Sequence, residues 1–218
     1  MKNKFLTDTR VTGLLYLGLA LAGGFAFMFA NAQLYVAGDP SATTLNLIQQ
    51  EPLARLGIAV ELLMVTFQAL AAVWFFKLFR KLDTFSAGLI AVFGTVNAVT
   101  TLIATALWLS ALNLALANGT SALAHNTFGM HETIWSVSGI FFGLWLVPMG
   151  ILASKAKMPK TLAAFLIAGG VGYVISTFIS ILLPGQKVIT NLLTIPATVG
   201  ELWMIGYLLV KPRLNVEE

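Results

Sequence analysis

Two glutamates lie inside segments that are otherwise apolar and long enough to cross a membrane. Glu61 stands in RLGIAVELLMVTFQAL (55–70), and Glu201 stands in TIPATVGELWMIGYLLVK (194–211). An ionisable side chain inside a bilayer costs about 2.5–3.5 kcal/mol on insertion scales, so such residues usually face the bundle interior or a wet cavity. Both carboxyl groups are therefore candidate ligand-binding or protonatable groups.

Neutral polar residues accompany the two glutamates at helical spacing. Gln68 follows Glu61 by seven residues, which places both on one face of a helix. Thr198 belongs to a stripe with Glu201 that also contains Thr190 and Thr194, and a third polar stripe is formed by Asn97, Thr101 and Thr105. The sequence predicts Gln68, Asn97 and Thr198 as neutral contacts for a ligand. The alternative is that each polar group forms one structural hydrogen bond between helices.

The depth of these residues follows from the helical rise. Glu201 is ten residues from Lys211, about 15 Å, and Glu61 is sixteen residues from Lys77, about 24 Å. No Lys or Arg lies at a matching depth, and Arg55 could approach Glu61 only by reaching inward. This pattern predicts a polar pocket that is open to the outside and closed toward the cytoplasm.

A second polar cluster is expected at the outer mouth of this pocket. The stretch HNTFGMHETIW (125–135) contains His125, His131 and Glu132. Two histidines six residues apart do not share a helical face as those of a His-Glu-x-x-His motif do, so no metal is expected. If a metal site existed, His125 and His131 would be its ligands. No phosphate loop or Gly-x-Ser-x-Gly motif occurs, and no cofactor is expected.

Composition excludes a soluble protein. Of the 218 residues, 58% are hydrophobic and 10% are charged, whereas soluble domains carry about a quarter charged residues. The net charge of +4 does not indicate nucleic-acid binding, because the Lys and Arg residues are spread along the chain beside the apolar segments. The absence of cysteine excludes disulfides and thiolate metal sites. The lipid bilayer is the expected partner, and oligomeric state stays open.

The elements that position these residues are six apolar segments, each long enough to span a bilayer. They are predicted at 11–36, 53–76, 84–117, 128–154, 161–183 and 188–210, in one domain covering 1–218. The first is longer than a signal-peptide core, which predicts a retained helix. In the longest connection, 37–52, we expect a Gly-Asp-Pro turn and then a short helical turn with Ser41 as its N-cap.

Positive charge divides unevenly between the two sides of these six segments. One side collects eleven Lys and Arg residues: Lys2, Lys4, Arg10, Lys77, Arg80, Lys81, Lys155, Lys157, Lys160, Lys211 and Arg213. The other side has Arg55 and Lys187. The positive-inside rule then predicts that both termini are cytoplasmic.

Small residues at helical spacing predict where the helices pack closely, because association in lipid depends on close contact rather than on the hydrophobic effect. The fifth segment carries the longest such stripe. The stripes are Gly169, Gly172, Ser176 and Ser180 in the fifth segment, Ser136, Gly139 and Gly143 in the fourth, and Ala20 and Gly24 in the first.

Four stretches resemble a known family. They are RVTGLLYLGLALAGGFA (10–26), RLGIAVELLMVTFQALAAVWFFKLFRKL (55–82), FFGLWLVPMGILASKAKMPKTLAAFLIAGGVGYV (141–174) and PATVGELWMIGYLLVK (196–211). In this order they resemble the bacterial membrane proteins of domain of unknown function 4386. The resemblance implies a six-helix inner-membrane protein in which Arg10, Arg55, Glu61 and Glu201 recur. It implies no activity.

These observations favour a membrane protein without enzymatic activity. Its outward-facing pocket would bind or transport a small solute, including a cation, or protons through Glu61 and Glu201. One alternative is an accessory or scaffolding subunit whose buried carboxylates are structural. A further alternative is an intramembrane metal-dependent hydrolase that uses His125 or His131 with the carboxylates.

Overall fold

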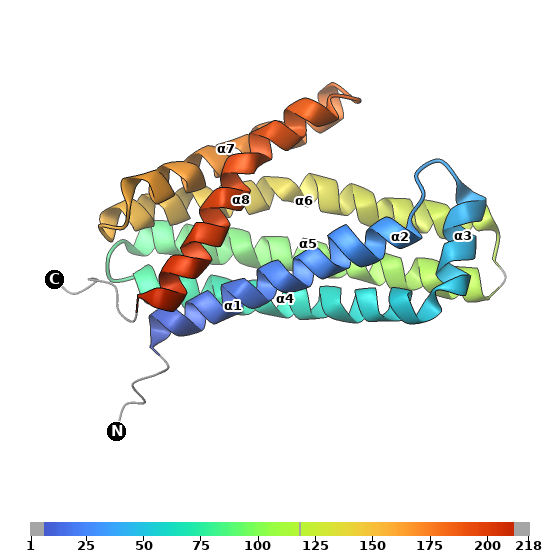
Figure 1. The fold of residues 1–218 in the computed structure, drawn as a ribbon, viewed down its shortest axis with the longest axis horizontal. Coiled ribbons are helices and arrows are strands. Elements are labelled where there is room, and N and C mark those ends of the chain that lie inside the picture. The colour runs from blue at the N-terminus through green and yellow to red at the C-terminus, as the bar shows by residue number, and fades with distance from the viewer. Residues whose placement is uncertain (1–6, 118, 212–218) are drawn as a thin grey trace. The chain divides into compact units, whose positions relative to one another are not determined.

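The computed structural model describes residues 7–117 and 119–211, which form helices joined by short turns and contain no strand (Figure 1). Among these described residues, six helical stretches are long and apolar enough to cross a membrane. They are α1–η1–α2 (Asp8–Gly23, Gly24–Asn31 and Ala32–Leu34), α4 (Glu51–Phe79), α5 (Thr84–Leu116), α6 (Ser121–Lys155), α7 (Lys160–Leu182) and α8 (Lys187–Val210). The predicted all-α membrane protein with six spans is confirmed.

The helices begin and end near the limits of the apolar segments, because apolar length and helix length are set by the same residues. The largest difference is in α6, which begins at Ser121, seven residues before the predicted span. Its first two turns contain polar residues, which lower the mean hydropathy and therefore lay outside the predicted span. His125 and His131 both lie within this helix. A helix of this length, about 50 Å, exceeds the hydrocarbon thickness of about 30 Å.

The chain divides into two compact units, which are described separately. Unit 1 comprises the described residues of 1–17, 68–97 and 138–218, and unit 2 comprises those of 18–67 and 98–137. The chain passes between the units within α1, α4, α5 and α6, so each of these helices contributes residues to both.

In unit 2, a short helix, α3 (Pro40–Gln49), follows the predicted turn at the end of α2. Gly38 adopts a φ of 77° in this turn, a conformation that favours glycine. The N-cap of α3 is Asp39, whose Oδ1 accepts a hydrogen bond from the backbone N–H of Ala42 at 2.9 Å. The expectation that Ser41 caps this helix is therefore wrong. Pro40 takes the first helical position, where a missing N–H costs nothing, and so the helix starts two residues earlier.

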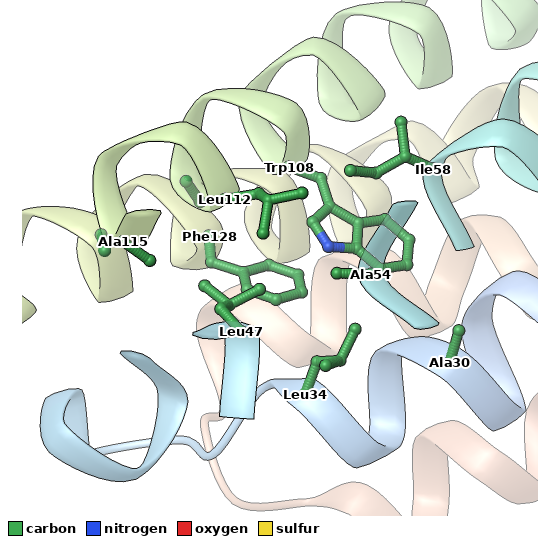
Figure 2. Close-up of a cluster of buried hydrophobic side chains, with 11 residues drawn as sticks. Ala30, Leu34, Leu47, Ala54, Ile58, Trp108, Leu112, Ala115 and Phe128 are labelled. Atoms are coloured by element: carbon green, nitrogen blue, oxygen red, sulfur yellow. The ribbon is translucent and has the colours of Figure 1, made fainter. Parts of the chain in front are cut away.

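An apolar cluster fills unit 2 where α3 meets the adjoining helices (Figure 2). Leu47 of α3 packs with Leu34, Trp108 and Phe128, and each of these side chains is fully buried. Figure 2 shows the Phe128 and Trp108 rings beside one another, with ring centroids 5.3 Å apart. The complete cluster is Ala30, Leu34, Leu47, Ala54, Ile58, Trp108, Ala111, Leu112, Ala115, Ala124 and Phe128.

The first spanning stretch contains a π-helical segment, η1, which changes the face that the helix buries. A seven-residue repeat from the buried Leu19 and Ala26 would continue to position 33, but Gln33 is exposed and Leu34 is buried. A π-helix carries more residues per turn than an α-helix, so it delays the following residues by one position. Asn31 thereby joins the buried face.

In unit 1, α7 and α8 lie side by side and pack through glycine (Figure 1). A Cβ on Gly169 would lie 2.3 Å from the backbone of Ala197, and one on Gly172 would lie 2.0 Å from the carbonyl oxygen of Leu193. The packing role predicted for Gly169 and Gly172 is confirmed.

The other members of the predicted small-residue stripes divide between packed and open positions. In unit 1, Gly143 packs against Gly170 and Gly139 lies near Thr177, while Ser176 is buried. Four predicted members are exposed or face open space: Ser136, Ser180 and Ala20 are exposed, and a Cβ on Gly24 would meet nothing within 4 Å. The packing stripe predicted for the first segment is therefore wrong, since hydropathy does not show which small residues face a neighbour.

Candidate functional site

A histidine of unit 2 lies between two carboxyl groups. His131 Nε2 is 3.0 Å from Glu61 Oε1 and 3.1 Å from Glu61 Oε2, which joins α6 to α4. His131 Nδ1 is 3.0 Å from Oε1 of Glu132, the next residue of α6. We call Glu61, His131 and Glu132 the triad. All three were predicted as polar site residues, Glu61 in the pocket and the other two at its mouth.

Each carboxyl group of the triad also accepts a hydrogen bond from a neutral donor. Trp135 Nε1 donates to Glu61 Oε1 at 2.7 Å, and Asn31 Nδ2 donates to Glu132 Oε1 at 2.6 Å. Neither donor was predicted. Trp135 lies four residues after His131, and so on the same helical face, which is a signal that the sequence contained.

The hydrogen bonds set the number of protons in the triad. Each contact between a carboxyl group and a ring nitrogen needs one hydrogen, so the two contacts hold two protons. If both protons are on His131, the ring is cationic between two carboxylates. If one is on a glutamate, the ring is neutral. Either arrangement has a net charge of −1 and can accept a third proton.

Aromatic rings enclose His131. The Trp108 ring lies 5.2 Å from the imidazole between centroids, and the Phe128 ring lies 5.6 Å from it, edge to face. The Glu61 and His131 side chains are each only 1% exposed, whereas the Glu132 side chain is 27% exposed. The triad therefore extends from a buried acid to an acid that reaches the surface of the unit.

His125, the other predicted histidine, has partners of its own in unit 2. Its Nδ1 is 3.0 Å from Thr43 Oγ1 of α3, and its ring stacks on Tyr35 with centroids 5.1 Å apart. Across the described residues, no group of three or more His, Asp or Glu side chains, the triad included, is arranged to hold a metal ion. His125 thereby links α3 to α6 through Thr43.

Arg55 and Tyr35 are further ionisable residues of unit 2. Arg55 donates to Glu51 at 2.7 Å, and its side chain is 55% exposed, so it is engaged away from the triad. The phenol of Tyr35 has a pKa above its usual value, because burial and then the negative charge of Glu132 oppose its ionisation. Tyr35 therefore stays neutral near Glu132 at physiological pH.

Glu201 has a hydrogen-bond partner in unit 1. Tyr16 Oη donates to Glu201 Oε1 at 2.5 Å, which joins the first helix to α8. The Tyr16 side chain is buried, and its ring lies edge to face against Phe75 and Trp145, with centroids 5.4 Å and 5.5 Å away. Tyr16 was not predicted, although it is the last residue of the RVTGLLY stretch that carried the family resemblance.

The predicted neutral contacts take different positions. Asn97 and Gln68 are buried in unit 1, and the Gln68 Nε2 has no hydrogen-bond partner among the described residues. Thr198 is exposed, while its neighbour Ala197 faces Gly169 of α7. Glu61 belongs to unit 2 and Glu201 to unit 1, so a single pocket that contains both stays a prediction.

Comparison with known proteins gives one family. The family model described as Domain of unknown function (DUF4386) matches residues 11–211, which is most of the chain. No curated protein and no solved structure matches.

Proposed function

The chain belongs to the DUF4386 family of domains of unknown function, and from its geometry we propose that it is a proton-binding membrane protein. The triad would take up and release a proton, and this exchange would accompany the binding or transport of a small solute.

The observation that carries this proposal is His131 between two carboxyl groups inside a membrane-spanning helix. Chains of Glu, Asp and His in such segments are typical of proton relays, because burial there is costly. A single structural hydrogen bond would need only one neutral partner. Three coupled titratable groups that share two protons are more than helix packing requires.

The proposal places the triad toward the outer face of the inner membrane. Glu61 follows the start of α4 by ten residues and Glu132 follows the start of α6 by eleven, so each lies about 15 Å along its helix. These helix starts belong to the side with two basic residues, opposite the side with eleven. The positive-inside rule then supports cytoplasmic termini and an outward-facing triad.

The alternative is an accessory or scaffolding subunit in which the carboxyl groups lock helices together. The hydrogen bond from Tyr16 to Glu201 favours it, because this bond links the first helix to the last within unit 1. Purification with a partner subunit at fixed stoichiometry would support this alternative. It would also require that the triad does not change its proton content across the physiological pH range.

The experiment is nitrogen NMR of the histidine rings in protein reconstituted into lipid nanodiscs. The sequence contains only two histidines, so His125→Gln assigns both. We expect the nitrogen chemical shifts to show that each His131 ring nitrogen shares a hydrogen with a carboxyl group. These shifts should change when pH is varied. Glu61→Gln should remove one of the two shared protons.

A control and a contradicting outcome complete this test. Glu51→Gln removes an acid from the start of α4 that is paired with Arg55 and lies outside the triad, so His131 should titrate as in the wild type. A His131 ring that stays in one neutral tautomer from pH 5 to 9 would show that the triad is structural.

A further inference from the structure

We infer that the triad exchanges its proton with water through Glu132, and that Glu61 is the inner acid at which the route ends. This inference rests on the proposed function, and it specifies the path by which the buried site is reached.

The route along the helix axis is closed by apolar packing. Trp108 and Phe128 contact the His131 ring on one side and belong to the apolar cluster on the other. Leu34 and Leu47 of the same cluster are fully buried beside them (Figure 2). A proton carrier would have to cross this layer without a polar partner, which is costly.

The polar route leads through the flank of α6. From Glu61 to His131 and from His131 to Glu132 the steps are 3.0 Å each, which is hydrogen-bond distance. Exposure rises along the route from 1% at Glu61 and His131 to 27% at Glu132. Glu132 is thus the most exposed member of the triad, and under this inference it is where the route meets water.

The transfer balances without another reactant. Glu132 takes a proton from hydronium or from a buffer acid, which makes the triad neutral with three protons. In the two-proton triad, His131 Nε2 first passes its own proton to Glu61, so the ring keeps its hydrogen on Nδ1 and each of the three groups holds one proton once Glu132 is protonated. Release runs through the same steps in reverse, and no group is oxidised or reduced.

The other titratable groups of unit 2 do not offer a shorter route. Tyr35 is a neutral phenol near Glu132, His125 is bonded to Thr43, and Arg55 is paired with Glu51. Asp39 caps α3 and is exposed. Asn31 donates to Glu132 and orients its carboxyl group, but an amide does not release a proton, so Asn31 is a positioning residue.

The experiment measures the rate at which the His131 ring hydrogens exchange with water, by NMR at constant pH in nanodiscs. We expect Glu132→Gln to slow exchange about a hundredfold, the effect of losing an acid–base group. Formate, a small acid that can enter from water, should restore part of the rate. Glu132→Asp keeps a carboxyl group and should retain most of it, and Glu51→Gln is the matched control.

A second variant tests the route if Glu132→Gln does not fold. Leu47→Ala opens the apolar cluster, and under this inference exchange should keep the wild-type rate. Faster exchange in Leu47→Ala, or wild-type exchange without formate in Glu132→Gln, would overturn the route through Glu132. Neither result affects the proposed function, which fails only if wild-type His131 does not change its proton content with pH.

Discussion

Replacement of Gly172 by alanine should destabilise the packing of α8 against α7. The added Cβ would lie 2.0 Å from the carbonyl oxygen of Leu193, whereas ordinary van der Waals contact begins at 3.4 Å. The two helix backbones would have to separate locally by about 1.4 Å, because a backbone carbonyl in the middle of a helix cannot rotate away as a side chain can.

The magnitude follows from the known cost of overpacking. Extra carbon atoms in a packed interior cost about 1–3 kcal/mol, or roughly 5- to 150-fold in the folded population. Alanine also favours the helix over glycine by about 0.5–1 kcal/mol, so the net loss should lie near 1–2 kcal/mol.

The assay is thermal and denaturant unfolding of purified protein in detergent. Gly206→Ala is the matched control, because a Cβ at this position of α8 would meet nothing within 4 Å. Gly206→Ala should be as stable as the wild type or more stable. If Gly172→Ala unfolded at the same temperature and denaturant concentration as Gly206→Ala, the close approach of α7 and α8 would be refuted.

Three further predictions concern single hydrogen bonds and an ion pair. Tyr16→Phe removes the donor to Glu201 and should lower stability by about 1–3 kcal/mol; an unchanged melting temperature would mean that this bond is not formed. Asp39→Ala should cost about 1 kcal/mol and speed amide exchange in α3, since it removes the N-cap. The hydrogen bond from Lys155, with those from Ser86, lowers the pKa of Asp83, so the carboxylate stabilises the fold above about pH 4 and loses this effect as pH falls. Asp83→Asn should therefore be less stable than the wild type at pH 7 but equally stable at low pH, and a difference independent of pH would contradict the ion pair.

The helices were predictable because apolar length is a local property of the sequence. Both α5, predicted at 84–117 and found at Thr84–Leu116, and α8, predicted at 188–210 and found at Lys187–Val210, match within one residue. The start of α6 was less predictable, because a helix can extend beyond the bilayer on polar residues.

The residues of the triad were predictable one by one, but their contacts were not. Glu61, His131 and Glu132 stand out because ionisable groups are rare in apolar segments. A helix that is apolar on all sides does not show which face meets a neighbour, so the sequence did not indicate that His131 faces Glu61.

Three hydrogen-bond donors were missed for reasons that differ. The phenol of Tyr16 and the indole of Trp135 count as apolar in a hydropathy analysis, although each carries a donor that a buried carboxyl group can use. Asn31 was missed because an uninterrupted α-helix would not have placed it on the buried face. Thr198 was included because a stripe of threonines seemed to share the environment of Glu201, whereas the structure exposes Thr198 and turns Ala197 inward.

The π-helical segment Gly24–Asn31 has a consequence for insertions and deletions. Because η1 delays the helix by one position, loss of one residue between Gly24 and Ala30 would convert it to a plain α-helix and leave Leu19 and Leu34 on the same face. A relative that lacks one residue between Gly24 and Ala30 would keep Leu19 and Leu34 on one buried face. The same deletion elsewhere in the helix would turn Leu34 outward. Alignments of this family should therefore place a single-residue gap within this segment.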